Sequence, residues 1–199
     1  MIYYTADPHF GYPEVLTKTG RPFQTVEEMD KTLIDNWNRV VTPEDTVYLL
    51  GDIGGHDAPF PAQQLAQLQG HKHLIRGNHD TGLEQPERLF DYFESVTDLW
   101  ETEDGDVHVI LCHYPFVHVR GGYMIHGHFH DVQKEGYDVL RQLPRVLNAG
   151  VDVNGFCPVT LQQLIENNRA FYHDPHRGET FYGKKRGWKS AFRPLPTQK

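Results

Sequence analysis

The chain has 199 residues, of which 38% are hydrophobic and 23% charged, with a formal net charge of −8; this composition excludes a disordered chain, and the length favours one domain. No apolar run approaches the roughly 20 residues that cross a bilayer, and the first residues lack the basic and apolar regions of a secretion signal, so we expect a cytoplasmic protein without membrane contact. Two cysteines, Cys112 and Cys157, are too few for a disulfide scaffold or an all-cysteine zinc site. The 13 histidines require an explanation, because histidine is the commonest metal ligand.

Short β-rich runs alternate with helical patterns along the chain, and this alternation predicts an α/β architecture. Several of the runs are largely apolar, as expected of strands that are covered on both faces. The six expected strands are 2–6, 46–50, 72–76, 107–112, 123–126 and 145–149.

Two helices are clearly marked. Thr25 and Glu28 form a capping box, and apolar residues then recur at helical spacing as far as Val40. Thr160 and Gln163 open a second box of the same kind. The helical pattern is weaker over 61–69 and too irregular for assignment over 131–144 and 171–199.

The charge is distributed unevenly. Residues 184–199 hold six basic residues and no acidic one, which leaves a formal charge of −14 on residues 1–183. We therefore expect a single domain over 1–183 and a basic C-terminal tail over 184–199. The simplest interpretation of the tail is a solvated segment, although its cations, with Trp188 and Phe192 for base stacking, would also suit a nucleic acid.

The residues that follow the strands give the strongest functional signal. Five of the six expected strands end directly in a turn that offers a metal ligand. Ligands in open α/β sheets gather beyond the carboxyl ends of strands, so we expect these turns to converge on one place. The turns are Asp7-Pro8-His9, Gly51-Asp52, Gly77-Asn78-His79-Asp80, His113 and Gly127-His128-Phe129-His130.

Seven nitrogen and oxygen donors lie in these turns: Asp7, His9, Asp52, Asn78, His113, His128 and His130. Seven are too many for one tetrahedral ion and fit two metals that share a carboxylate. Because the set contains no thiolate, we expect two divalent ions, Mn²⁺ first and otherwise Fe, Zn²⁺ or Ni²⁺. Each motif alone is common, as a capping residue or a turn, but all five in order behind strands are not expected by chance.

In this order the five turns resemble the five-block signature of the calcineurin-like metallophosphoesterase superfamily, over residues 5–130. The segments Arg21-Pro22-Phe23 and 148–159 are similar to its small bacterial and phage branch. The resemblance implies a four-layer α/β/β/α sandwich with two mixed β-sheets and a dinuclear centre at their rim. One departure is Tyr12, where that branch often has a further histidine, and it concerns substrate contacts rather than metal binding.

The resemblance also implies how the donors divide between two metals, with Asp52 bridging. The first metal would be held by Asp7, His9, Asp52 and His130, and the second by Asp52, Asn78, His113 and His128. A hydroxide bridging the two metals would then attack phosphorus in line.

Four further residues receive expected roles. His79 would act as general acid, or as electrostatic stabiliser, for the leaving oxygen. Asp80 would hydrogen-bond the other ring nitrogen of His79 and so set its tautomer. His118 and Arg120 lie between two of the turns and would either reach a substrate phosphate or remain in water.

The expected activity is hydrolysis of a phosphate ester, with a phosphodiester slightly preferred and a nucleotide or nucleic acid as a candidate substrate. One alternative is a phosphomonoesterase, including a protein phosphatase. Another is a noncatalytic scaffold on the same fold, which would be expected to lose ligands, whereas here His79 and each ligand position are filled.

Overall fold

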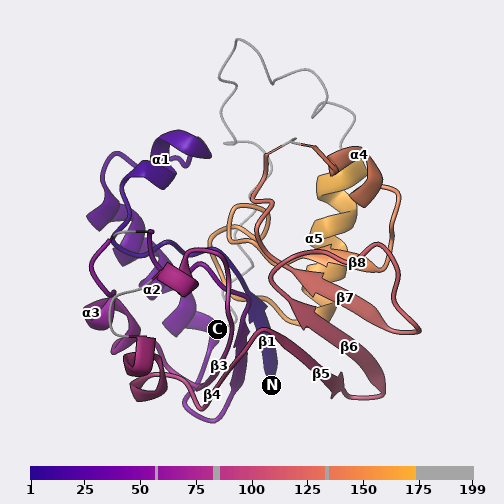
Figure 1. Ribbon diagram of the computed structural model, residues 1–199, viewed down its shortest axis with the longest axis horizontal. Helices are drawn as coiled ribbons and strands as arrows, with labels where there is room; N and C mark the ends of the chain where they lie inside the picture. The colour runs from indigo at the N-terminus through magenta and orange to yellow at the C-terminus, as the bar shows by residue number, and fades with distance from the viewer. Residues whose placement is uncertain (57, 83–85, 133–134, 174–199) are drawn as a thin grey trace, which may run out of the picture.

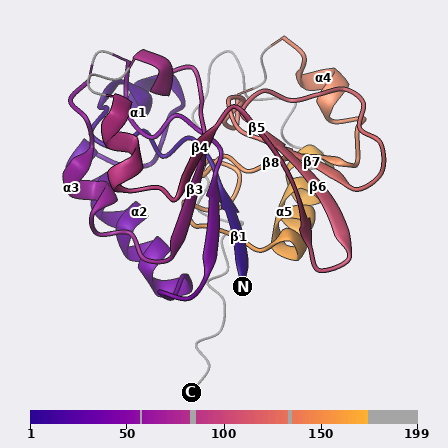
Figure 2. The same ribbon diagram turned by 60° about the horizontal axis from the view of Figure 1, so that its bottom comes forward.

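The predicted alternation of strands and helices is present in the computed structural model, which describes residues 1–56, 58–82, 86–132 and 135–173. The strands form two four-stranded sheets that face each other, and helices lie outside each sheet (Figure 1, Figure 2). None of the described helices has both the length and the apolar composition needed to span a bilayer. The basic tail expected at 184–199 lies outside the described residues.

The first sheet is entirely parallel in its four strands. Their spatial order is β1 (Ile2–Thr5), β2 (Thr46–Leu49), β3 (His71–Ile75) and β4 (Ser95–Thr97). We expected this sheet to be mixed, but the antiparallel pairing described for it is an isolated bridge between Tyr4 and Val159. Each connection between these strands contains helical segments that return the chain to the same end of the sheet, and such crossovers produce parallel neighbours.

The second sheet is mixed, as expected. Its strands are β5 (Leu99–Asp104), β6 (Val107–Cys112), β7 (Tyr123–His126) and β8 (Val146–Asn148), with β5 antiparallel to β6 and the others parallel. The sequence analysis missed β4, which has three residues, and β5, a half-exposed edge strand with carboxylates on its outer face. The signal for β5 was the two-residue Gly105-Asp106 turn into β6, where Gly105 has φ +61°.

In the described residues, five α-helices and two 3₁₀ segments connect and cover the strands. Both predicted capping boxes are confirmed: Thr25 Oγ1 accepts from the Glu28 N–H (3.2 Å), and the Thr160 N–H donates to Gln163 Oε1 (3.0 Å). The helix expected over 61–69 is limited to one turn. The helices are α1 (Glu14–Lys18), α2 (Val26–Val40), α3 (Ala62–Leu65), α4 (Tyr137–Leu140) and α5 (Leu161–His173), and the 3₁₀ segments are η1 (Asp80–Gly82) and η2 (Pro86–Asp91).

Three apolar clusters fill the spaces between the layers. One includes Trp37 of α2 and Val47 of β2, and it joins the first sheet to its helices. A second, with Tyr4 and Leu111, lies between the two sheets. The third joins Met124 of β7 to the chain around α4 and α5. The order of layers is therefore α/β/β/α, which confirms the predicted sandwich (Figure 2).

His126, at the end of β7, makes the stability of this core sensitive to pH. Its ring is fully buried, Nδ1 lies 2.7 Å from the Gly127 carbonyl, and Nε2 has no hydrogen-bond partner among the described residues. Burial lowers the pKa of His126 to about 4. Because the unfolded chain takes up this proton at higher pH than the folded chain, folding stability is lost as pH falls from about 6.5 towards 4.

We expect His126→Leu to remove this component of the pH dependence. Between pH 7 and pH 5 the wild type should lose about 2 kcal/mol more of its unfolding free energy than the variant does. Urea unfolding of both metal-free proteins at the two pH values measures the difference, since the other titrating groups are common to both. Parallel stability profiles would contradict a neutral, buried His126.

Candidate metal centre

The carboxyl ends of β1, β2, β3, β6 and β7 meet at one rim of the sandwich, and the five predicted turns meet there. Backbone hydrogen bonds join turn to turn: the Asp7 N–H donates to the Gly51 carbonyl (3.0 Å) and the Gly127 N–H to the His113 carbonyl (3.0 Å). Strand ends that are distant in sequence are thereby fixed side by side, and their polar side chains face a common space.

All seven predicted donors lie in two adjacent groups. Asp7, His9 and His130 form one, and Asp52, His113 and His128 form the other; in each, the ligand atoms lie within 4.8 Å of one another. Asn78 belongs with the second, because its Oδ1 is 3.1 Å from His113 Nε2 and 2.9 Å from His128 Nδ1. A third grouping, of His9, Asp52 and His79, overlaps both.

Asp52 lies between the two groups. Its Oδ2 is 3.7 Å from His9 Nε2 and 3.6 Å from His113 Nε2, so one oxygen atom faces a histidine of each group. Its Oδ1 accepts from the His79 N–H (2.9 Å), which fixes the orientation of the carboxylate. This is the position that a bridging carboxylate occupies between two cations.

The protonation of the histidines fits a divalent cation in each group. His113 Nδ1 donates to the Leu50 carbonyl (2.7 Å) and His9 Nδ1 to the Gly54 carbonyl (2.8 Å). A carbonyl oxygen only accepts, so in the neutral rings each Nε2 presents a lone pair to the rim. Each group therefore offers an imidazole lone pair beside the shared Asp52 oxygen, and a cation in each group would satisfy both atoms.

The backbone of the turns is held in an unfavourable conformation. Six non-glycine residues in the described part of the chain have positive φ, and five of them are predicted ligands: Asp7 (58°), His9 (53°), Asp52 (56°), His128 (69°) and His130 (50°). The left-handed region costs about 1–2 kcal/mol for such residues. Strain concentrated on one set of side chains is typical of a functional site.

Close packing behind Asp52 explains why one of the turn residues is glycine. A Cβ on Gly77 would lie 2.2 Å from Asp52 Oδ1 and 2.8 Å from His113 Cε1. No side chain fits there without displacing the carboxylate, so the turn after β3 requires glycine at this position.

The site concentrates negative charge in a buried place. Asp7 and Asp52 are 0% and 2% exposed. Burial, with a smaller contribution from the Asp52 carboxylate, raises the pKa of Asp7 above its ordinary value, although His130 and His113 partly oppose this. Bound cations would offset both the burial and the repulsion between the carboxylates.

A buried ion pair that the sequence analysis missed supports His130. Asp152 Oδ2 lies 2.7 Å from His130 Nδ1, and the same carboxylate accepts from Arg21 Nε (2.7 Å) and Nη2 (2.9 Å). Arg21 also donates to the Asp7 carbonyl (2.7 Å), so it ties together two turns of the site. Burial alone would raise the pKa of Asp152, but Arg21 and His130 hold it well below its ordinary range. The available signal was a sixth strand end, since Asp152 follows β8.

The structure corrects the role expected for Asp80. Its carboxylate accepts from the backbone N–H groups of Asp52 (2.8 Å), Ile53 (2.9 Å) and Gly77 (2.7 Å), and it therefore holds the turns rather than the His79 ring. The His79 Nδ1 instead accepts from the His56 N–H (2.7 Å). In the neutral ring the proton therefore lies on Nε2, and burial lowers the pKa of His79, which favours that neutral form.

His118 and Arg120 lie in the loop between β6 and β7, and both are exposed. Neither belongs to the groups of metal-binding side chains found in the described chain. Their contact with a substrate phosphate stays a prediction.

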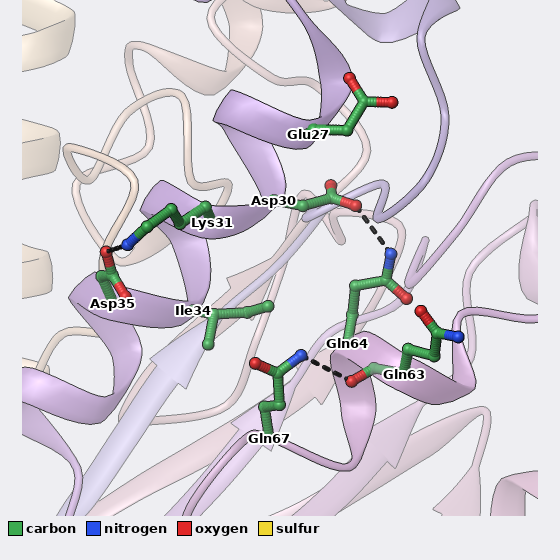
Figure 3. A pocket seen from close by; sticks show the side chains of 8 residues that line it. All are labelled: Glu27, Asp30, Lys31, Ile34, Asp35, Gln63, Gln64 and Gln67. Atoms are coloured by element: carbon green, nitrogen blue, oxygen red, sulfur yellow. Dashed lines mark hydrogen bonds and ion pairs between the residues drawn. The ribbon is translucent and has the colours of Figure 1, made fainter.

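A hollow of about 420 Å³ lies between α2 and α3 (Figure 3). Three carboxylates and three amides line it, and its one cation, Lys31, is paired with Asp35, so it is a poor place for a phosphate. Asp30 at its edge accepts from Gln64 Nε2 (2.8 Å) and from the Gly11 N–H (3.0 Å). Because Gly11 follows His9 by two residues, Asp30 contributes to the metal centre by holding that turn in place.

The four-layer sandwich and its rim of histidines and carboxylates define a metallophosphoesterase. The model of one family, calcineurin-like phosphoesterase, matches residues 1–191, and the chain belongs to that family. It is accordingly a hydrolase that acts on phosphate esters.

Relatives are found in archaea, bacteriophages and bacteria. The chain is 33% identical to the uncharacterised protein MJ1445 of Methanocaldococcus jannaschii, over 83% of this chain and 89% of that one. It is 29% identical to the gene 66 protein of Mycobacterium phage L5, over 77% and 87%. The crystal structure of AQ665, a protein of unknown function from Aquifex aeolicus, superposes with a TM-score of 0.67 and 25% identity, over 83% of this chain and 98% of that one.

Proposed function

We propose that the chain hydrolyses a phosphodiester at a centre of two divalent cations, with Mn²⁺ as the first candidate. The first cation would be held by Asp7, His9, Asp52 and His130, and the second by Asp52, Asn78, His113 and His128. The observation that carries the proposal is the position of Asp52 Oδ2, which faces histidine Nε2 atoms of both groups at 3.6 and 3.7 Å.

When bound, two such cations supply Lewis acidity towards the phosphoryl oxygens and lower the pKa of a water molecule. The chain holds the reacting groups in place: Asp80 and Asp30 fix the turns through backbone N–H groups, and Asp152 orients the His130 ring. His79 presents Nε2–H to the substrate and donates to the leaving oxygen as negative charge develops there.

The charge of the chain supports a diester over a monoester. The reacting phosphate of a diester carries one negative charge, whereas that of a monoester carries up to two, and the chain has a net charge of −8. Repulsion therefore penalises the monoester more. Rates on bis-p-nitrophenyl phosphate and p-nitrophenyl phosphate at the same Mn²⁺ loading compare the two classes directly.

Metal analysis tests the centre itself. After reconstitution with Mn²⁺ and gel filtration, the wild type should retain about two ions per chain. His128→Gln should retain about one, because it loses a ligand of the second group. His71→Gln is the matched control, since His71, at the start of β3, is exposed and pairs with Glu94 outside the site. This variant should retain two ions per chain. A wild type that binds no metal and hydrolyses no ester would favour the noncatalytic scaffold.

A further inference from the structure

A second pocket, of about 200 Å³, opens beside the first group of ligands. It is lined by His9, His79 and His130 and by five further residues, Tyr12, Val15, Lys18, Thr19 and Val132. Sites that enclose drug-sized ligands measure roughly 300–1,000 Å³, so this pocket holds a chemical group rather than a whole molecule. Because it borders His79, the group that enters it belongs to the leaving side of the substrate.

Lys18 gives the pocket its charge. Among the residues that line the pocket, Lys18 is the one with a permanent charge. Glu14, whose carboxylate lies 2.8 Å from Lys18 Nζ, does not line the pocket. Lys18 Nζ also donates to the Tyr12 hydroxyl (3.0 Å). Two of its three N–H donors are thus directed within the described chain, and the third is left for a ligand. The hydrogen bonds to Glu14 and Tyr12 raise the pKa of Lys18, so it remains a cation at neutral pH.

Tyr12 holds this cation in place. The Tyr12 ring is buried, and its centroid lies 5.7 Å from the ring centroid of His9 and 5.7 Å from that of His79. On its other side the ring lies against the backbone of Gly55, where a Cβ would be 2.1 Å from the ring. The Tyr12 hydroxyl donates to Glu14 (2.6 Å) as it accepts from Lys18, so the ammonium is attached to a rigid group. A pre-oriented cation loses little side-chain entropy when it binds an anion.

We propose that this pocket is a subsite for a second phosphate group, carried by the leaving group of the substrate, with Lys18 as its cationic contact. The inference rests on the proposed function and deepens it. The substrate class is a phosphodiester whose leaving group bears another phosphate, either a diester of a single nucleoside phosphate or a nucleic-acid strand. Lys18 is the specificity-determining residue for that class, because a leaving group without the second charge gains nothing from it.

Binding and turnover of matched probes test the subsite in Lys18→Met and Glu14→Gln. Lys31→Met is the control, since Lys31 pairs with Asp35 on α2 with the same spacing of four residues as Lys18 and Glu14. Calorimetry on Mn²⁺-loaded protein, at constant free Mn²⁺, compares inorganic phosphate with methylenediphosphonate and adenosine 3′,5′-bisphosphate. Hydrolysis of thymidylyl-thymidine with and without a terminal 3′-phosphate covers the nucleic-acid substrate.

Lys18→Met should reduce the preference for the probes with two phosphates by about tenfold, with phosphate affinity unchanged. Glu14→Gln should increase that preference, because it releases the ammonium from a competing carboxylate, and Lys31→Met should not alter it. The bisphosphate and the dinucleotide distinguish the two sources of the second phosphate. Unchanged preference in Lys18→Met, in protein that still binds phosphate, overturns the inference. If the Mn²⁺-loaded wild type neither binds phosphate nor hydrolyses the esters, the proposed function is overturned, and the subsite with it.

Discussion

His79→Asn should leave the metal content unchanged and lower kcat by a factor on the order of 10²–10⁴. The metal centre survives because the contact of His79 with Asp52 is made by the backbone N–H, which the substitution retains. The rate falls because the variant loses the Nε2–H, which the hydrogen bond from the His56 N–H to Nδ1 directs away from the loop and towards the site.

The size of the loss should depend on the leaving group. A p-nitrophenyl ester releases a stable anion that needs little help, whereas an alkyl ester such as a nucleotide releases a basic alkoxide. We expect the larger loss of kcat with the alkyl ester, because donation to the leaving oxygen matters most there. Single-turnover rates on both esters measure this difference.

His108→Asn is the control, since His108 lies on β6 and pairs with Glu103 outside the site. Wild-type rates in His79→Asn would remove His79 from the mechanism. Loss of metal together with activity would instead make His79 a ligand, as its grouping with His9 and Asp52 allows.

Arg21→Met should destabilise the fold by about 3–5 kcal/mol, because it removes the guanidinium that pairs at two points with the buried Asp152 carboxylate. The two side chains are 0% and 3% exposed, so water cannot replace the guanidinium. The substitution also removes the donor to the Asp7 carbonyl, which loosens the turn after β1. Urea unfolding of metal-free protein at neutral pH gives the change in free energy.

Arg76→Met is the matched control for this experiment. Arg76 forms a similar two-point pair with Asp98, but the side chains are 39% and 72% exposed. Such a surface pair contributes about 0–1 kcal/mol. If Arg21→Met costs no more than Arg76→Met, the buried pair does not stabilise the fold in the way proposed.

The same ion pair should affect metal affinity through His130. Asp152→Asn weakens the acceptor for His130 Nδ1, and loss of such an acceptor typically lowers metal affinity 10–100-fold. The second group of ligands, with His113 and His128, has no contact with Asp152 among the described hydrogen bonds, so of the two proposed ions we expect the one held by His130 to be lost first on dilution.

The sequence by itself determined the parts that depend on local rules. A strand followed at once by a polar turn is visible in the sequence, and the carboxyl ends of parallel strands share one edge of a sheet, so strand order and the family resemblance together predicted that Asp7, Asp52 and His128 meet. The cap at Thr25 was equally local, because a capping box spans one helical turn.

The tertiary structure alone decided the features that depend on distant or backbone partners. Arg21 and Asp152 are 131 positions apart, and no local sequence pattern indicates that they form a pair. The position of the His79 proton is set by the His56 backbone N–H rather than by Asp80. Every residue except proline has such a donor, so the sequence does not show which one would bind the ring. β5 stayed hidden because a half-exposed edge strand obtains its stability from pairing with β6, not from its own composition.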